Sequence, residues 1–315
     1  PQGLEGFSVE AFDPFRFTFT AGQVFFSASD FEHGTELWVS DGSPDGTAIL
    51  KDIASGPDPS AADGFTAAGN LCFFTAMFRR ELWVSDGTAL GTRRLSSPEY
   101  PSFLGAVDGR IFFNAYDPTR GTELWVSDGT PLGTRRFGVI APGSGFTALG
   151  DRYFFSASDA EHGTELWVSD RTLQDMRIFK DLVPGLGSSL PRALTTVGDR
   201  LLFAALDPDH GWELWVSDGS PEGTGILKDI LPGPASSLPE GLSAVGDRVF
   251  FRATDLEHGD ELWLSDGTAV GTMLFADLAP GSGGSHPWNF TVAGDQLFFY
   301  AQDNQLGMQL WVLDL

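Results

Sequence analysis

Residues 36–47 read ELWVSDGSPDGT, and similar stretches recur along the whole chain. The further copies are ELWVSDGTALGT at 81–92, ELWVSDGTPLGT at 123–134, ELWVSDRTLQDM at 165–176, ELWVSDGSPEGT at 213–224, ELWLSDGTAVGT at 261–272 and QLWVLDL at 309–315. Their matched tryptophans are spaced by 45, 42, 42, 48, 48 and 48 residues, and they are Trp38, Trp83, Trp125, Trp167, Trp215, Trp263 and Trp311. A period of this length is typical of a four-stranded propeller blade, a pair of HEAT-like helices or a kelch-type unit.

The unit that begins at Ser243 decides between these architectures. Gly246-Asp247 lies between two short apolar runs, which is the signature of a tight hairpin turn. Residues 248–254, 261–265 and 273–278 read as further strands, and no window carries an uninterrupted helical period. Four short antiparallel strands in each of seven units predict an all-β fold, a seven-bladed β-propeller.

The two ends of the chain complement each other in this scheme. The last unit supplies three strands, near 290–292, 296–301 and 309–313, and lacks a fourth. Residues 4–11, LEGFSVEA, alternate apolar and polar residues as a strand does. We therefore expect this segment to be the outermost strand of blade 7, where it closes the ring and covers a sheet edge. Residues 1–315 are then a single domain.

Composition narrows the classes of partner. The 315 residues carry 43 acidic and 19 basic side chains, and the formal net charge of −24 repels phosphate backbones and anionic membranes. No apolar run approaches the roughly 20 residues that span a bilayer. Cys72 is the only cysteine, so neither an intrachain disulfide nor a thiolate metal cluster can form. We expect a monomer with no nucleic-acid partner and no membrane insertion.

Two repeated features are predicted to be structural. The Trp of each ELW places one large apolar side chain in every blade, which favours blade-to-blade packing over ligand binding. Each SDGTxxGT stretch reads as a turn in which the Asp carboxylate accepts a bond from an amide two residues on. Asp beside Gly also suggests calcium, but the D-x-D-x-D alternation of an EF-hand is missing. We expect no cofactor, with calcium as the open alternative.

Four of the five histidines occupy one loop position, in a D-x-x-H-G element that precedes the repeat. They are His33, His162, His210 and His258. Each blade offers a single histidine, which disfavours a zinc site, and a general base needs one special site rather than a repeated one. We expect each histidine to bond its own hairpin or the adjacent acidic residue. Their loops belong to the face of the predicted propeller that carries its long loops, and this place also makes the histidines candidate ligand contacts.

The ELWVSDGT copies resemble the ELWxxDGT-repeat family of predicted bacterial surface or secreted proteins. The resemblance covers nearly the whole chain. It implies export and a propeller-like repeat architecture, and it supplies no catalytic residues. We accordingly expect an extracellular or cell-surface location, with the signal peptide removed. The fourth copy departs from the repeat at Arg171, Asp175 and Met176, so its turn is expected to be looser or differently bonded.

The face that carries the long loops is the predicted binding face. The loops between second and third strands and the PGxSSxP connections, such as residues 184–191 and 232–239, should emerge together there. Trp212 and Trp288 depart from the repeat on this face and read as loop aromatics. Such a side chain stacks on a sugar ring or anchors a protein partner, and packing against its own blade is the alternative.

No catalytic cluster is predicted. A sialidase-like site needs several arginines that converge on a carboxylate, and the candidate arginines are scattered in the sequence; they are Arg79, Arg80, Arg120 and Arg192. The sequence therefore predicts a non-catalytic extracellular binding module for a glycan or surface polysaccharide. A protein–protein interaction scaffold is one alternative. A propeller hydrolase or lyase with an unrecognised site is the other.

Overall fold

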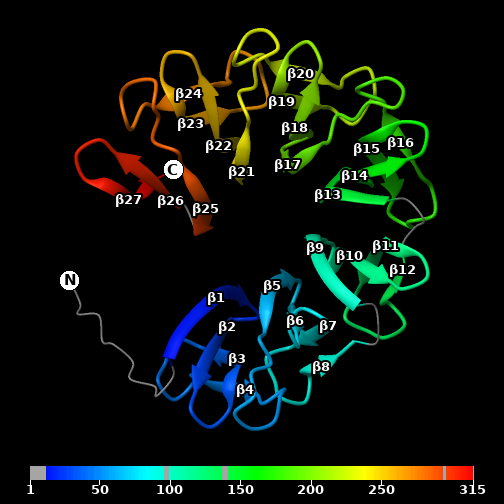
Figure 1. Ribbon diagram of the computed structural model, residues 1–315, viewed down its shortest axis with the longest axis vertical. Helices are drawn as coiled ribbons and strands as arrows, with labels where there is room; N and C mark the ends of the chain where they lie inside the picture. Colours follow the sequence, from blue (N-terminus) through cyan, green and yellow to red (C-terminus); the bar gives the residue numbers. More distant parts are fainter. Residues whose placement is uncertain (1–11, 96–98, 137–140, 294–295, 315) are drawn as a thin grey trace. The chain divides into compact units, whose positions relative to one another are not determined.

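The computed structural model describes residues 12–95, 99–136, 141–293 and 296–314. All regular structure in this part of the chain is β-strand, and consecutive antiparallel sheets form the seven blades of a β-propeller, as predicted (Figure 1). Two compact units, Pro1–Pro142 and Gly143–Leu315, are described separately below. The predicted closing strand at residues 4–11 lies outside the described residues.

The first unit contains three four-stranded blades. Blade 1 consists of β1 (Phe12–Thr20), β2 (Gln23–Asp30), β3 (Gly34–Ser40) and β4 (Ala48–Lys51). Blade 2 consists of β5 (Asp63–Ala68), β6 (Leu71–Ala76), β7 (Glu81–Ser85) and β8 (Arg93–Arg94). Blade 3 consists of β9 (Glu99–Val107), β10 (Arg110–Asp117), β11 (Gly121–Ser127) and β12 (Arg135–Arg136).

The second unit begins within β13 and contains blades 4 to 7. Blade 4 consists of β13 (Ala141–Leu149), β14 (Arg152–Asp159), β15 (Gly163–Asp170) and β16 (Met176–Lys180). Blade 5 has β17 (Arg192–Val197), β18 (Arg200–Asp207), β19 (Gly211–Ser217) and β20 (Gly225–Lys228). Blade 6 has β21 (Glu240–Val245), β22 (Arg248–Asp255), β23 (Gly259–Ser265) and β24 (Met273–Ala276). The described part of blade 7 is three-stranded, with β25 (Trp288–Ala293), β26 (Gln296–Asp303) and β27 (Gly307–Asp314).

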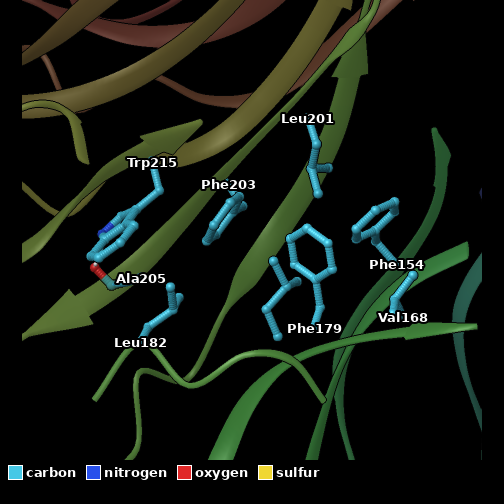
Figure 2. Packing of buried hydrophobic residues seen from close by; sticks show 9 residues of the cluster. Phe154, Val168, Phe179, Leu182, Leu201, Phe203, Ala205 and Trp215 are labelled. Carbon is cyan, nitrogen blue, oxygen red and sulfur yellow. Dashed lines mark hydrogen bonds between the residues drawn. The ribbon is translucent and has the colours of Figure 1, made fainter. Parts of the chain in front are cut away.

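In blades 2, 3, 5, 6 and 7 the repeated tryptophan packs against a cluster that includes the preceding blade, as predicted. Figure 2 shows Trp215 and Phe203 of blade 5 in one cluster with Phe154 and Phe179 of blade 4. The rings of Phe203 and Trp215 stack at 6.2 Å between centroids. Trp263 of blade 6 joins a cluster with residues of blade 5 in the same way. Burial of one such side chain contributes about 2–3 kcal/mol to stability.

The repeated aspartate closes a turn, again as predicted. Asp266 Oδ1 accepts bonds from the Thr268 amide at 2.8 Å and from the Thr268 hydroxyl at 2.7 Å. A Cβ on Gly271 would lie 2.1 Å from that oxygen, so only glycine fits there. The fourth copy has Asp175 in place of this glycine, and the Gln174 amide bonds Asp170 instead. This turn is therefore differently bonded.

The glutamate of each ELW has a role that the sequence did not reveal. Glu213 is fully buried and accepts bonds from the amides of Ile230 and Ser237 and from the Ser237 hydroxyl. These donors belong to the connection that leads to blade 6. Glu36, Glu165 and Glu261 hold the corresponding connections after blades 1, 4 and 6. The carboxylate thus orders the chain between two blades.

Blades 2 and 3 lack the PGxSSxP connection and use arginine as the partner of this glutamate. Arg94 Nη1 lies 2.9 Å from Glu81 Oε1, and Arg136 Nη1 lies 2.9 Å from Glu123 Oε1. Both arginines lie on the short fourth strands. A carboxylate that is taken out of water needs either amide donors or a cation. Blades 1, 4, 5 and 6 supply amides of the connection, and blades 2 and 3 supply an arginine.

The three lysines of the chain link adjacent blades. Lys228 at the end of β20 donates from Nζ to the Thr272 carbonyl in the repeated turn of blade 6, at 2.6 Å. Lys51 reaches the Thr92 carbonyl of blade 2 at 2.6 Å, and Lys180 contacts the equivalent turn of blade 5. In each case the lysine reaches from one blade to the blade that follows it in sequence.

Candidate functional site

The face predicted for binding is built by two sets of loops that lie together. In the second unit, the Ser237 amide donates to the Trp212 carbonyl at 3.0 Å, and the His286 amide donates to the Asp260 carbonyl at 3.0 Å. The connection that leaves each blade therefore crosses the hairpin between its second and third strands. Gly211 closes one of these hairpins with a φ of 71°. A Cβ there would lie 2.4 Å from the Ala235 carbonyl of the connection, so the two loops pack backbone to backbone.

Both divergent tryptophans lie in strands, and their predicted placement in loops was wrong. Trp212 is the second residue of β19 and pairs with Leu206, because the Gly211 turn lets the strand start immediately. Trp288 is the first residue of β25 and pairs with Tyr300. Each side chain is therefore fixed by a sheet at the edge of the loop face, which gives it a defined orientation.

Trp212 lies beneath an arginine. The Arg192 guanidinium carbon lies 4.0 Å from the centre of the Trp212 ring, a close cation–π contact. Arg192 Nη2 lies 3.4 Å from Glu240 Oε1, at the first residue of the neighbouring blade's inner strand. Among the described residues, Nε and Nη2 of Arg192 have no hydrogen-bond partner although both are shielded by protein atoms. A shielded donor without a hydrogen bond is costly, so Nε and Nη2 of Arg192 favour binding of a polar or anionic acceptor.

Glu240 connects Arg192 to a series of charges across blades 5 to 7. Arg252 Nη2 lies 2.6 Å from Glu240 Oε2, and Arg252 Nη1 lies 3.8 Å from Asp260 Oδ2. His286 Nδ1 then lies 3.0 Å from the same oxygen of Asp260. Opposite charges alternate from Arg192 through Glu240 and Arg252 to Asp260, so each of these groups supports the position of the next.

Arg79 and Arg192, two of the four arginines considered from the sequence, contact different carboxylates, but each shares its carboxylate with an arginine outside that set. Arg192 and Arg252 both contact Glu240, and Arg16 and Arg79 both contact Asp63. These residues are far apart in sequence because each blade supplies only one or two of them. Equivalent positions in adjacent blades become neighbours in space.

Trp288 forms one wall of a small pocket within the second unit. Its ring stacks on Tyr300 with centroids 5.1 Å apart, yet 48% of the residue remains exposed. The pocket has a volume of about 160 Å³, and its lining consists of Glu240, Gly241, Arg252, Pro287, Trp288, Asn289 and Phe290. An apolar ring face thus lies beside a carboxylate, a guanidinium and an amide. The pocket therefore offers an apolar surface beside hydrogen-bonding groups.

The four repeated histidines bond their own hairpins, which confirms that prediction. The Nδ1 atoms of His33, His162 and His258 each lie 2.9 Å from Oδ2 of the aspartate three residues earlier. In blade 5, His210 Nδ1 lies 2.6 Å from Asp207 Oδ1. None of the four lines the pocket beside Trp288. Their role as ligand contacts stays a prediction.

These histidine–aspartate pairs predict a pH dependence of the loop face. The bond to Asp255 raises the pKa of His258 above its ordinary value of 6.5. Burial alone would raise the pKa of Asp255, but the bonds from His258 outweigh it and lower that pKa below 3.8. The histidine contribution to stability is present below pH 6.5 and is lost as the pH rises through the raised pKa. The aspartate contribution is present above pH 3.8 and is lost as the pH falls through the lowered pKa.

We therefore expect these loops to be best ordered between about pH 4 and 6.5. Histidine NMR titration should give a pKa above 6.5 for His258, and this pKa should return toward 6.5 in Asp255→Asn. An unchanged pKa in this variant would show that the hairpin bond does not control the histidine.

Other classes of site find little support in the described residues. No group of three or more His, Cys, Asp or Glu side chains is arranged there to hold a metal ion, and calcium binding stays an untested possibility. The same part of the chain has no helix long and apolar enough to cross a bilayer.

Comparisons with known proteins show the fold alone. No protein-family model matches the chain, and no curated protein matches it in sequence. Its structure is similar to that of a prolyl endopeptidase, with a TM-score of 0.63 and 13% identity over 97% of this chain and 48% of that chain. A puromycin hydrolase matches with a TM-score of 0.58 and 15% identity, over 96% of this chain and 52% of that chain. The designed Ika8 protein matches with a TM-score of 0.55 and 14% identity, over 94% of this chain and 82% of that chain. The chain spans about half the length of the two enzymes. The part that it matches shares its propeller fold.

Proposed function

We propose that the chain is a non-catalytic extracellular module that binds a glycan or surface polysaccharide through the loop face of blades 5 to 7. The half-exposed Trp288, stacked on Tyr300 beside the Glu240–Arg252 pair, carries this proposal. The resemblance of the repeats to exported ELWxxDGT proteins is the basis of the proposed location. A ligand that is held at a repeated face gains from contacts in more than one blade.

The chemistry of the pocket suits a sugar ring. The apolar face of a sugar stacks on an indole, while its hydroxyl groups accept bonds from a guanidinium and donate to a carboxylate. Arg252 and Glu240 already bond each other at 2.6 Å, so both are fixed before a ligand arrives and little conformational entropy is lost. A volume of about 160 Å³ is below the 300–1,000 Å³ of a typical small-molecule pocket. The site therefore takes one residue of a longer chain rather than enclosing a whole ligand.

We expect Trp288→Ala to weaken glycan binding about tenfold, because the stacking contact is lost. Binding is measured on an array of glycans and bacterial polysaccharides, once with calcium and once with EDTA, and then by calorimetry on the ligand found. Met308→Ala is the matched control, since it also removes a half-exposed apolar side chain of blade 7 but lies outside the pocket. The melting temperatures of both variants should match that of the parent within a few degrees.

Two outcomes would contradict the proposal. An array without binding in either buffer would exclude a glycan ligand and favour a protein-interaction scaffold. Selective binding that survives in Trp288→Ala would place the site elsewhere on the molecule.

A hydrolase is the second candidate, because the similar structures include enzymes of about twice the length of this chain. In this case the chain would be the propeller portion of a larger peptidase. Release of a chromogenic group from prolyl and acylaminoacyl peptide substrates by the longest available form of the protein would support this candidate. Absence of turnover together with glycan binding would exclude it.

A further inference from the structure

A larger cavity lies in the first unit, between the inner strands of blades 2 and 3. It has a volume of about 470 Å³, which is within the range of small-molecule pockets. Its lining is contributed by β5, β6, β9 and the turn between β6 and β7, and it consists of Gly64, Phe65, Thr66, Thr75, Arg79, Tyr100, Pro101, Ser102 and Phe103. Neither Trp212 nor Trp288 belongs to it, and Arg79 is the one lining residue considered from the sequence, as a candidate arginine for a carboxylate site.

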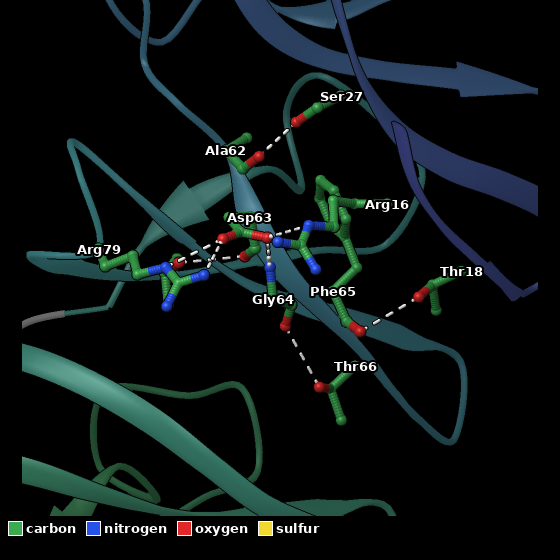
Figure 3. A network of polar contacts seen from close by, with 10 residues as sticks. Arg16, Thr18, Ser27, Ala62, Asp63, Gly64, Phe65, Thr66 and Arg79 are labelled. Atoms are coloured by element: carbon green, nitrogen blue, oxygen red, sulfur yellow. Dashed lines mark hydrogen bonds and ion pairs between the residues drawn. The ribbon is translucent and has the colours of Figure 1, made fainter. Parts of the chain in front are cut away.

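One exposed arginine marks the edge of this cavity and is held in place from behind. Figure 3 shows Arg79 and Arg16 on either side of Asp63. Arg79 Nε donates to Asp63 Oδ2 at 2.9 Å, and Arg16 Nε lies 3.1 Å from Asp63 Oδ1. The Gly64 amide also donates to Asp63 Oδ1, at 2.7 Å. Two guanidinium groups thus meet one carboxylate whose oxygens are already bonded, so a net positive charge remains.

The hairpin beside the cavity is three residues shorter than its counterparts in the neighbouring blades. Phe74 pairs with Trp83, nine residues further on, whereas Phe26 of blade 1 and Phe113 of blade 3 each pair with a tryptophan twelve residues further on. Residues 77–80 join β6 to β7. Met77, Phe78 and Arg79 all have a positive φ, between 53° and 63°. Three consecutive non-glycine residues in this region are strained, and strain of this kind is retained where the surrounding structure requires a special geometry. Here the turn places Arg79 in the lining of the cavity.

Aromatic and hydroxyl groups line the rest of the cavity. Tyr100 is half exposed, its amide donates to the Arg80 carbonyl at 3.3 Å, and the Arg80 guanidinium lies 5.7 Å from its ring centre. Pro101 and Phe103 add apolar surface on the same strand, and Thr66, Thr75 and Ser102 add hydroxyl groups. The Tyr100 ring is therefore positioned by the turn, as Arg79 is.

We propose that this cavity is a second binding site, for a sugar that carries a carboxylate. The guanidinium of Arg79 takes the carboxylate, because its Nε and Nη2 are occupied by Asp63 while the group remains 65% exposed on the other side. The face of the half-exposed Tyr100 ring takes the apolar side of the sugar ring. The Ser102 and Thr66 hydroxyls bond the sugar hydroxyls, and these neutral donors and acceptors favour a sugar acid over an acidic peptide. In a chain with a net charge of −24, a locally positive site also selects for its anionic ligand.

The test compares a galacturonate tetramer with its methyl ester and with a glutamate tetrapeptide, by calorimetry on the intact chain. We expect the galacturonate to bind and the methyl ester to bind at least tenfold more weakly, because the ester has no charge for Arg79. Arg79→Gln and Tyr100→Ala should each reduce galacturonate binding about tenfold or more. Arg93→Gln is the control, since it removes an exposed arginine of the same blade outside the cavity.

The outcomes also separate this site from the proposed glycan site. Trp288→Ala should leave galacturonate binding unchanged, whatever becomes of other glycans. Equal binding of the ester, or galacturonate binding that survives in Arg79→Gln, would overturn the proposal. Arg79-dependent binding of the peptide without binding of the sugar would replace it with an acidic-peptide site. Absence of binding by all three probes, with the melting temperature of the chain unchanged, would also overturn it.

Discussion

We expect Glu213→Ala to lower the free energy of unfolding by about 4 kcal/mol. Glu213 is completely buried, and it accepts bonds of 2.9 Å from the Ile230 amide, 3.0 Å from the Ser237 amide and 2.6 Å from the Ser237 hydroxyl. Alanine removes the carboxylate from all three donors; the Ile230 amide then has no acceptor, and the Ser237 amide and hydroxyl keep only the Trp212 carbonyl, at 3.0 and 3.3 Å. Each buried donor that loses its partner costs about 1–3 kcal/mol, and the freed connection adds a loss of order between blades 5 and 6.

Urea denaturation of the variant and the parent measures this effect. Glu222→Ala is the matched control, because Glu222 lies exposed in the same blade and its removal should change the free energy of unfolding by less than about 0.5 kcal/mol. Glu213→Gln keeps an acceptor oxygen and the side-chain shape. Its loss of unfolding free energy should therefore lie between those of Glu213→Ala and Glu222→Ala. A loss of less than about 1 kcal/mol in Glu213→Ala would show that water replaces the carboxylate easily, and the connection would then be held by other contacts.

Arg136→Ala should cost about 3 kcal/mol by leaving Glu123 buried without its cation. The Glu123 side chain is 8% exposed, and its Oε1 bonds Arg136 Nη1 at 2.9 Å. Its other oxygen has no hydrogen-bond partner among the described residues. A carboxylate in this position cannot be solvated when the guanidinium is removed. The expected cost is at the lower end of the range for a broken buried ion pair because Arg136 itself is one-third exposed.

A double-mutant comparison isolates the charge. Arg135→Ala removes the adjacent exposed arginine and should have little effect. Glu123→Gln combined with Arg136→Ala should recover most of the stability lost in Arg136→Ala, because the neutral amide is cheaper to bury than a lone carboxylate. If the double variant is as unstable as the single one, the loss comes from the packing of the arginine stem rather than from charge.

The repeat predicted most of the fold because one unit determines all the others. The tryptophan spacing and the turn after each ELW fix the blade, and the Asx bond at Asp266 follows from its residue types alone. Contacts between blades were harder to predict, since their partners share no local pattern. Glu213 and Ser237 are twenty-four residues apart, and only the folded connection brings them together.

A signal for the candidate site was nevertheless present in the sequence. Arg192, Glu240 and Trp288 are separated by the same 48 residues as the tryptophans of their blades, so they occupy one structural position in three neighbouring units. Reading each position across the repeats, rather than along the chain, would have placed them side by side. The cavity beside Arg79 has no such repeated pattern. The sequence shows that the hairpin of blade 2 is shorter, but the space beside it depends on how β5 and β9 pack.

The lysine links between blades have a direction, and this gives the protein an order of assembly on the ribosome. Lys51, Lys180 and Lys228 each bind a carbonyl that is synthesised about forty residues later. In blades 1, 4 and 5 the lysine ammonium group therefore stays in water until the next blade has emerged, and its contact forms only when that blade folds. A chain that stops early exposes one incomplete blade at its growing end, while the blades already behind it are finished.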